Sequence, residues 1–325
     1  MKPASAVTLH PHDFQGYVPD RLPADVVRDL SKLRPAKAIA AIIVEWIAII
    51  IAIALCERFW NPFSYALAIV WISARQQALT ILGHDVAHYR LFSNRTLNDW
   101  VGNITTLWPT FLAADGYRFF HGDHHRFTGT PEDGNRKIWF THTPEGNLRP
   151  EWTYPKTALG LVWTIMRRAM FVTGIFWILR GLIATILMQK SVVKIVARLG
   201  FYAAGVAIMA EFGLLRGFLL YWIVPYCTWH IALQYIRLIC EHSAIQSEDP
   251  AYAVTRTTMV SWWERWLVLP RNIHYHIEHH WYPSVPFYNL PELHQRLQEQ
   301  PGFRKKAVIT SSVAASLRQC IAFDE

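Results

Sequence analysis

The stretch from Ala38 to Leu55, AIAAIIVEWIAIIIAIAL, is apolar throughout except for Glu45. A helix of this length is roughly 27 Å long, which matches the hydrocarbon core of a bilayer at about 30 Å. A turn at residues 59–62, FWNP, separates it from a second apolar stretch at residues 63–82. The sequence therefore predicts a helical hairpin that enters a membrane and returns.

The composition of the whole chain agrees with a membrane protein. Of its 325 residues, 52% are hydrophobic and 14% are aromatic, which is more than an ordinary soluble domain carries. The net charge of +8 would also suit a nucleic-acid partner, but no basic helix or nucleic-acid motif accompanies it. Membrane proteins collect Lys and Arg on their cytoplasmic side. We therefore attribute the positive charge to the orientation of the chain in the membrane and expect no nucleic-acid partner. The four cysteines are widely scattered and predict neither a disulfide framework nor a thiolate metal site.

Two further spans are predicted in the second half of the chain. Three apolar stretches there could span the membrane, at residues 169–188, 192–212 and 214–237. We assign the last two to a second hairpin because Lys190, Lys194 and Arg198 flank its entry as cytoplasmic anchors. The stretch at 159–188 is interrupted by arginines, and we expect it to lie in the membrane interface. The predicted fold is an all-α integral membrane protein with about four transmembrane helices in two hairpins, at residues 38–55, 63–82, 192–212 and 214–237.

Basic residues orient the predicted spans. Lys32, Arg34 and Lys37 precede the first span, whereas the loop after it contains only Arg58. Both hairpins are therefore expected to begin and end on the cytoplasmic side. We expect residues 1–37 to form a cytoplasmic N-terminal lead-in and residues 38–325 one domain, in which 84–190 and 238–325 form a helical cytoplasmic cap.

Eight of the 15 histidines fall in three clusters. The first cluster reads H-x-x-x-H and the other two read H-x-x-H-H. On a helix, residues three or four apart share a face, so each cluster can aim its ring nitrogens at one spot. Neutral imidazole binds iron, zinc and copper, and the clusters therefore predict a metal site. The residues are His84 and His88, then His121, His124 and His125, then His276, His279 and His280.

The clusters and their surroundings resemble the histidine boxes of the membrane fatty acid desaturase and hydroxylase superfamily. The matching segments are HDVAH at 84–88, HGDHHRFT at 121–128 and YHIEHHWYPSVP at 275–286, and the resemblance covers roughly residues 74–297. It implies a four-span enzyme whose cytoplasmic cap holds two non-haem irons, with O2 as co-substrate. The superfamily often takes a further ligand from the end of the fourth span. That position falls on His242, so the resemblance implies nine candidate ligands.

Several carboxylates stand beside the candidate ligands and could orient them by accepting the other ring N–H. The alternative is that they are solvated or paired with nearby arginines. They are Asp85, Asp123, Glu241 and Glu278.

Other polar residues near the spans have simpler interpretations. Arg75, Gln76 and Gln77 lie close to the cytoplasmic end of the second span, where snorkelling to water accounts for them. We expect His230, inside the fourth span, to be hydrogen-bonded within the helix bundle, and His294 to be a surface residue.

The implied chemistry is oxidation of a lipid C–H bond, which requires a redox-active metal with open coordination positions. The segment at 283–291 is similar to that of acyl desaturases and favours a fatty acid desaturase, which inserts a double bond into an acyl chain. A hydroxylase or ketolase of the same superfamily, acting on a carotenoid, alkane or sphingolipid, is the alternative. A zinc hydrolase is disfavoured because no H-E-x-x-H is present. A metal transporter or other metal-binding membrane protein is disfavoured because its ligands would lie at mid-bilayer.

The expected partners are the membrane, a lipid substrate and an electron donor. No H-P-G-G haem motif of the cytochrome b5 type is present. Electrons are therefore expected from a separate ferredoxin, rubredoxin, or cytochrome b5 with its reductase, and the basic cytoplasmic face would attract an acidic donor. The predicted location is a multi-pass position with the active site on the cytoplasmic face, in a membrane that no targeting tag identifies.

Overall fold

The computed structural model describes residues 18, 20–130, 132–135, 155–189, 191–247 and 249–321. This part of the chain is mostly helical, with one pair of short parallel strands. The α-helices are α1 (Ala24–Leu30), α2 (Pro35–Arg58), α3 (Pro62–Ala87), α4 (Arg95–Gly102), α5 (Ala114–Phe127), α7 (Ala158–Arg168), α8 (Phe171–Leu187), α9 (Val192–Glu211), α10 (Leu215–Phe218), α11 (Ile231–His242), α12 (Trp262–Leu267), α13 (His276–Trp281), α14 (Leu290–Gln298), α15 (Pro301–Lys306) and α16 (Val313–Gln319). The π-helices are η2 (Asn103–Leu107), η4 (Leu219–Ile223) and η5 (Tyr226–His230), the 3-10 helices η6 (Pro250–Tyr252) and η7 (Phe287–Asn289), and the strands β1 (Thr257–Thr258) and β2 (Ile309–Thr310).

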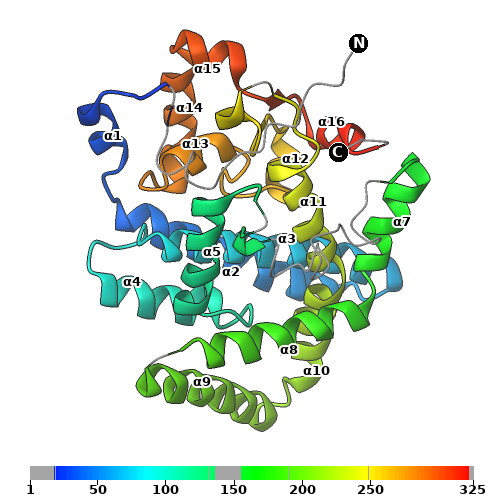
Figure 1. The fold of residues 1–325 in the computed structure, drawn as a ribbon. Helices are drawn as coiled ribbons and strands as arrows, with labels where there is room; N and C mark the ends of the chain where they lie inside the picture. Colours follow the sequence, from blue (N-terminus) through cyan, green and yellow to red (C-terminus); the bar gives the residue numbers. More distant parts are fainter. Residues whose placement is uncertain are drawn as a thin grey trace.

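Figure 1 shows the arrangement of these elements. The long helices α2 and α3 cross the middle of the molecule, α8, α9 and α10 lie at one end, and α12 to α16 gather with α1 at the other. Helix α11 runs from the first end towards the second, and α5 lies across α3. The expected mostly helical class is therefore confirmed.

Helix α3 is the most buried of the long helices. Its most apolar 18-residue stretch is 72% buried, against 28% for α2 and 6% for α9. Pro62 begins the helix, and the Asn61 side chain caps it by accepting hydrogen bonds from the backbone N–H groups of Phe63 and Ser64. The short turn at this cap returns the chain, so α2 and α3 pack side by side. The end of α3, with His84, consequently lies in the interior.

Polar side chains in the middle of α3 pair with the backbone of the helical run α10–η4–η5–α11. Ser73 Oγ donates to the carbonyl of Pro225 at 3.0 Å, and Gln76 Nε2 donates to that of Trp222 at 2.9 Å. Both carbonyls belong to the stretch that contains the two π-helices, whose wider turns leave carbonyl groups for neighbouring side chains to satisfy. Gln76 is fully buried, so the predicted snorkelling of this residue to water is wrong.

A buried ion network joins α2, α3 and the loop before α13. Glu45 Oε2 lies 2.8 Å from Nη1 of Arg75, and Glu45 Oε1 accepts from Nε of Arg271 at 2.6 Å. The Arg75 guanidinium also lies beside the stacked rings of Trp71 and Trp266, 5.0 and 4.8 Å from their centroids. A lone charge would be costly in this interior, and the shared carboxylate offsets that cost. Arg75 is only 1% exposed, so snorkelling is wrong for this residue as well.

Three helices are long and apolar enough to cross a membrane, namely α2, α3 and α9. A fourth candidate is the bent pair of α7 with residues 171–183 of α8, which meet at 56°. The assignment expected from the sequence differs from this set, because it placed the fourth span at residues 214–237 and residues 159–188 in the membrane interface. At 214–237 the structure has the run α10–η4–η5–α11, in which π-helical segments interrupt the α-helix.

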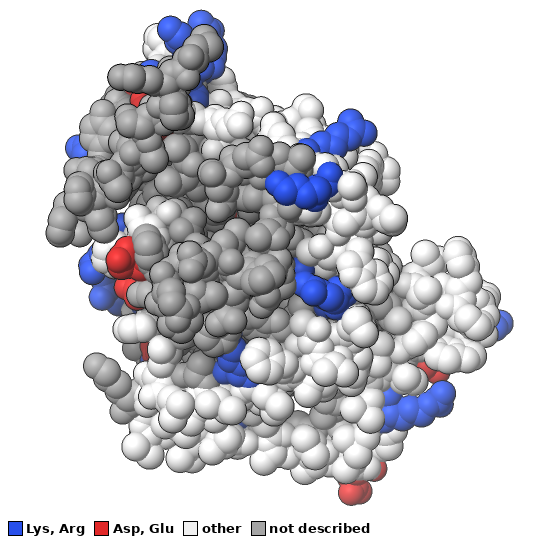
Figure 2. Space-filling view, turned by 45° about the vertical axis from the view of Figure 1, so that its right-hand side comes forward, with Lys and Arg blue, Asp and Glu red and all other residues white. Residues whose placement is uncertain are grey.

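The surface of α7, α8 and α9 is rich in exposed apolar side chains. Examples are Leu159, Trp163, Val172, Leu187 and Val193, each more than half exposed. Figure 2 shows one face of the molecule with large white areas, interrupted by separate Lys and Arg side chains. A surface of this kind suits contact with lipid better than contact with water.

Short helix α13 is held in place from two sides. Tyr275, which precedes it, pairs with Thr257 of β1 across an antiparallel bridge, and β1 pairs in parallel with β2. An apolar cluster shared with α14 and α15 buries Ile277 on the helix itself. The N-terminal segment packs onto the same cluster, where the backbone N–H of Leu22 donates to Tyr282 Oη at 2.9 Å. The histidines of α13 therefore stand on a firmly anchored element.

Helix α8 packs so closely on η5 that Gly174 leaves no room for a side chain. A methyl group there would lie 2.1 Å from Cα and 2.4 Å from the carbonyl oxygen of Cys227. We expect Gly174→Ala to destabilise the protein by about 1–3 kcal/mol through overpacking against backbone. The measurement is the melting temperature of the purified protein in detergent.

Gly205→Ala in α9 is the matched control. No heavy atom lies within 4 Å of the added methyl group, and alanine is the better helix former by roughly 1 kcal/mol. This variant should melt at or above the wild-type temperature. Equal melting temperatures for the two variants would contradict the close packing of α8 on η5.

Candidate metal centre

Nine histidines from four parts of the chain gather in the interior. Two lie at the end of α3, three lie on α5, one ends α11 and three lie on α13. Their ring nitrogens form two groups, within each of which the ligand atoms all lie within 4.8 Å of one another. The first group is His84, His88, His121, His125 and His279, and the second is His124, His242, His276 and His280. Every histidine proposed as a ligand from the sequence thus belongs to one of the two groups.

Helices α5 and α13 each contribute to both groups. On α5, His121 and His125 belong to the first group and His124 belongs to the second. On α13, His276 and His280 belong to the second group and His279 belongs to the first. Residues four apart on a helix differ in direction by about 40°, whereas neighbours differ by about 100°. The expectation that each cluster aims at one spot is therefore wrong for these two clusters.

Two imidazoles of the second group have fixed tautomers. His124 Nδ1 lies 2.9 Å from Oδ1 of Asp133, and His242 Nδ1 lies 2.9 Å from the carbonyl oxygen of Val254. Both oxygens accept, so both Nδ1 atoms carry the hydrogen, and in the neutral form of each ring Nε2 carries a lone pair. These Nε2 atoms lie 3.1 Å apart, and His276 Nε2 lies 2.8 Å from that of His242. Two lone pairs at this separation repel unless a cation lies between them.

The first group shows a similar conflict along a chain of Nε2 atoms. The Nε2 atom of His121 lies 2.8 Å from Nε2 of His88 and 2.9 Å from Nε2 of His125. The Nε2 atom of His125 in turn lies 3.0 Å from Nε2 of His279. A ring nitrogen carries at most one hydrogen, so hydrogen bonds between neutral rings can satisfy at most two of these three contacts. His84 Nε2 is buried with no hydrogen-bond partner among the described residues. A cation faced by all the lone pairs would satisfy the contacts together.

Both groups fit a metal ion. Burial lowers the pKa of His121, His125, His279 and His280 well below its ordinary value, and it lowers that of His88 to about 3. These five rings are therefore neutral at pH 7 and their lone pairs are available. Two nitrogens bound at right angles to a metal at about 2.1 Å would lie about 3 Å apart, as the closest pairs here do. Sets of imidazoles suit iron, zinc, copper and nickel.

Two of the expected carboxylates lie beside ring nitrogens, in different ways. Asp85 Oδ1 lies 3.4 Å from His84 Nδ1, opposite the ring nitrogen that has no partner. Glu241 Oε2 lies 3.6 Å from His276 Nε2, the nitrogen that faces the rest of its group. The other oxygen of Glu241 accepts from Arg237 Nε at 2.6 Å. Asp85 therefore has the expected position, whereas Glu241 stands on the side where a metal would bind.

The other two expected carboxylates form no described hydrogen bond or ion pair with a ring of either group. Glu278 accepts from the Thr257 hydroxyl at 2.6 Å and is hydrogen-bonded to His294. The side chain of His294 is 12% exposed, so the prediction of a surface residue is wrong. Asp123 lies on α5 without a described hydrogen bond to a histidine.

Asp133, and not the neighbouring Asp123, is the carboxylate that contacts His124. Its carboxylate binds His124 and also accepts from the backbone N–H groups of Gly129 and Asn135, at 3.1 and 2.8 Å. These backbone contacts fix the carboxylate in a buried loop after α5. No helical spacing relates Asp133 to the histidines. From the sequence, only its place as a carboxylate in the polar segment after the second cluster could have indicated this role.

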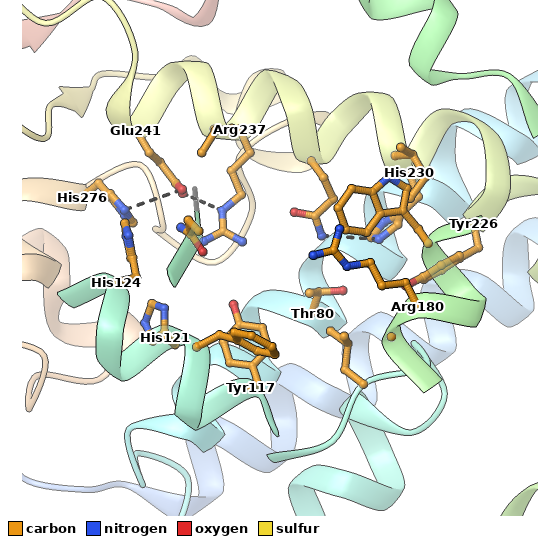
Figure 3. A pocket seen from close by; sticks show the side chains of 18 residues that line it. Thr80, Tyr117, His121, His124, Arg180, Tyr226, His230, Arg237, Glu241 and His276 are labelled. Carbon is orange, nitrogen blue, oxygen red and sulfur yellow. Dashed lines mark hydrogen bonds and ion pairs between the residues drawn. The ribbon is translucent and has the colours of Figure 1, made fainter. Parts of the chain in front are cut away.

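A cavity of about 180 Å³ adjoins both groups. Helices α3, α5, α8, η5 and α11 form its walls, and it reaches His121 of the first group and His124 and His276 of the second. Figure 3 shows these three rings on one side of the cavity and Arg180 with His230 on the other. A molecule in this cavity would lie next to both groups.

The chain is similar to known proteins over most of its length. A sequence model of the family "Fatty acid desaturase" matches residues 58–312. Dihydrorhizobitoxine desaturase of Bradyrhizobium elkanii is 31% identical over 292 residues, which cover 87% of this chain and 82% of that protein. An sn-1 oleoyl-lipid 12-desaturase of Arthrospira platensis is 27% identical over 266 residues, covering 75% and 73%. A chloroplastic omega-6 fatty acid desaturase of Glycine max is 25% identical over 249 residues, covering 73% and 57%.

The contact between Asp133 and His124 gives a test of the second group. Asp133→Ala removes the acceptor that fixes the ring tautomer, and we expect metal affinity to fall by about 10–100-fold. The measurement is the metal retained per chain, by mass spectrometry, after dialysis against increasing chelator concentrations. Asp123→Ala, next to His124 in the sequence, is the control and should retain metal like the wild type. Equal retention by the two variants would show that Asp133 does not support the site.

Proposed function

The chain belongs to the fatty acid desaturase family and is an oxidoreductase, and we propose that it is a membrane-bound, O2-dependent enzyme that introduces a double bond into an acyl chain. The observation that carries the proposal is the junction of two histidine groups with one cavity. The nine histidines of these groups are the proposed ligands. The resemblance noted in the histidine motifs is confirmed at the level of the family.

The proposed metals are two irons, one in each histidine group. Bound iron would supply the redox chemistry with O2 that removes hydrogen from a carbon chain, which a redox-inactive ion such as zinc does not provide. The chain itself determines where this chemistry takes place. His121, His124 and His276 border the cavity, so a carbon chain inside it would lie beside both groups.

The walls of the cavity would orient the substrate and exclude water. Leu112, Tyr117 and Trp177 present apolar surface to it, which favours a hydrocarbon chain over water. The hydrogen bond from Arg237 holds the Glu241 carboxylate next to His276 at the metal end. The cavity walls thus position the substrate chain, and Arg237 positions the Glu241 carboxylate, at the end of the cavity next to His276.

The relatives support desaturation in preference to hydroxylation or ketolation. The three named relatives are a dihydrorhizobitoxine desaturase, an oleoyl-lipid 12-desaturase and an omega-6 fatty acid desaturase. Their names share the reaction and differ in the substrate. We therefore take the reaction from the family and propose an acyl chain as the substrate because two of these names refer to fatty acyl groups.

We propose that α2 with α3, and α9 with the run α10–η4–η5–α11, form two transmembrane hairpins below a cytoplasmic cap. His88 caps the end of α3 and His242 ends α11, so each hairpin would deliver ligands at its returning end. Lys32, Arg34 and Lys37 stand before or at the start of α2, in agreement with a cytoplasmic entry.

We propose that electrons come from a separate donor, a ferredoxin, a rubredoxin, or cytochrome b5 with its reductase. Helix α15 exposes three consecutive basic side chains, Arg304, Lys305 and Lys306. It lies at the end of the molecule where α13 carries three of the proposed ligands (Figure 1). A positive patch in this position would attract an acidic donor.

The proposed reaction is tested in cells that express the chain. Wild-type cells should contain acyl products lighter than their precursors by two hydrogen atoms, detected by lipid mass spectrometry. His124→Ala removes one proposed ligand and should abolish these products while the protein still inserts into the membrane. His10→Ala, a histidine outside the three clusters, should leave them unchanged. Products heavier by one oxygen atom would contradict desaturation, and active protein that contains zinc without iron would contradict the metal assignment.

The proposed donor surface predicts a dependence on salt. Screening shortens the reach of charges from about 10 Å at 0.1 M to about 3 Å at 1 M salt, so the KM for an acidic donor should rise with ionic strength. Lys305→Glu should raise this KM at low salt with little change in kcat. Arg216→Glu on α10, at the opposite end, serves as the control of equal charge change. A KM that is independent of salt would refute electrostatic docking.

A further inference from the structure

The end of the cavity that lies away from the histidine groups is polar. Arg180 of α8, His230 of η5, Gln234 of α11 and Thr80 of α3 line it. Figure 3 shows Arg180 beside His230 and Tyr226, on the opposite side from the rings of the two groups. A hydrocarbon chain has no group that would match these side chains, so this end suits a polar part of the substrate.

Charged side chains line both ends of the cavity. The described lining residues include two guanidinium groups, those of Arg180 and Arg237, and one carboxylate, that of Glu241. Glu241 pairs with Arg237 at 2.6 Å, so the end near the histidines contains a compensated pair. Arg180 brings positive charge to the far end. A guanidinium has five N–H donors, so it can bind oxygens of a ligand in addition to its contacts with the protein.

The wall beside Arg180 is held in a fixed arrangement. His230 stacks on Tyr226 with centroids 4.5 Å apart and rings inclined by 24°, and its Nε2 lies 3.4 Å from Nε2 of Gln234. His230 is 1% exposed, so it contacts the helix bundle as expected and also faces the cavity. These residues lie in and after the π-helix η5, and π-helical turns often occur at functional sites.

We propose that this end of the cavity binds the carboxylate of the substrate, so that the enzyme acts on a free carboxylic acid and not on an acyl chain esterified to a membrane lipid. Guanidinium groups bind carboxylates through paired, charge-assisted hydrogen bonds. Such a pair is especially favourable in a cavity with apolar walls, where water competes little. This inference rests on the proposed desaturation and names its substrate class.

Anchoring at Arg180 would also select the bond that reacts. Glu241 follows His230 by eleven helical steps, which corresponds to roughly 16 Å along the axis. An extended carbon chain covers that distance in roughly a dozen bonds. An acid bound by its carboxylate would therefore present carbons at a set distance from that group to the histidines. Fixed positioning of this kind is a main source of selectivity in enzymes.

Binding of a short acid tests the proposal without turnover. The full chain, as purified, is placed in phosphatidylcholine nanodiscs and dialysed to equilibrium against labelled octanoate or its neutral analogue octanamide. Empty nanodiscs correct for partitioning into lipid, and the metal content of every sample is measured. The variants are Arg180→Gln, Arg180→Lys and, as a control on the exposed side of α7, Arg167→Gln.

The wild type should bind octanoate saturably and about tenfold more tightly than octanamide. Arg180→Gln should lose this preference with unchanged octanamide binding and metal content, and Arg180→Lys should keep part of it because the charge remains. Arg167→Gln should behave like the wild type. Equal binding of acid and amide by the wild type, no saturable octanoate binding, or a preference that survives in Arg180→Gln would overturn the proposal.

Two further outcomes separate this proposal from others. Loss of octanoate binding in nanodiscs that contain phosphatidylglycerol would assign the site to a lipid phosphate and overturn the proposal of a free acid. A negative dialysis result combined with products lighter by two hydrogen atoms in cells would refute the carboxylate site and leave desaturation standing.

Discussion

Lone pairs of buried imidazoles that face one another at about 3 Å repel, and the helices around α3 hold them in that arrangement. His124 and His242 show the constraint most clearly, because Asp133 and the carbonyl of Val254 fix both tautomers. The ends of α3, α5, α11 and α13 must converge for these rings to meet. A bound cation would convert this repulsion into the strongest contact between the four helices, so metal binding and the stability of the convergence are coupled.

The same convergence requires a central helix with a polar interior. Ser73 and Gln76 of α3 satisfy carbonyls of the π-containing run, and Arg75 shares Glu45 with Arg271. These contacts tie α3 to the π-containing run, to α2 and to the loop before α13, in an interior where an unpaired polar group would cost several kcal/mol. An all-apolar helix of the same length would pack as well but would not fix the rotation of α3, and that rotation directs His84 towards the first histidine group.

The sequence could predict the parts of the fold that follow from helical period and hydropathy. The apolar stretches at 38–55, 63–82 and 192–212 fall on α2, α3 and α9. The histidine motifs indicated eight of the nine clustered rings, and the family resemblance added His242. The division of α5 and α13 between two groups was not foreseen, because a spacing rule does not show which of two nearby points a ring faces. Asp133 was missed for a different reason: its approach to His124 depends on loop backbone that binds its carboxylate. Arg75 was misjudged because its partner Glu45, and Arg271, which shares that carboxylate, come from other segments that only tertiary structure brings together.

The division of α5 and α13 between the two groups makes the groups mechanically dependent on each other. Any cation that orders His121 and His125 also fixes the helix that carries His124, and the same holds across α13. Binding of the first ion orders these helices and costs conformational entropy. The second ion then binds to helices that are already ordered, so this cost does not recur. Occupancy should therefore be cooperative, with chains holding two ions or none in preference to one. Helices α5 and α13 would in this way couple the occupancy of the two histidine groups.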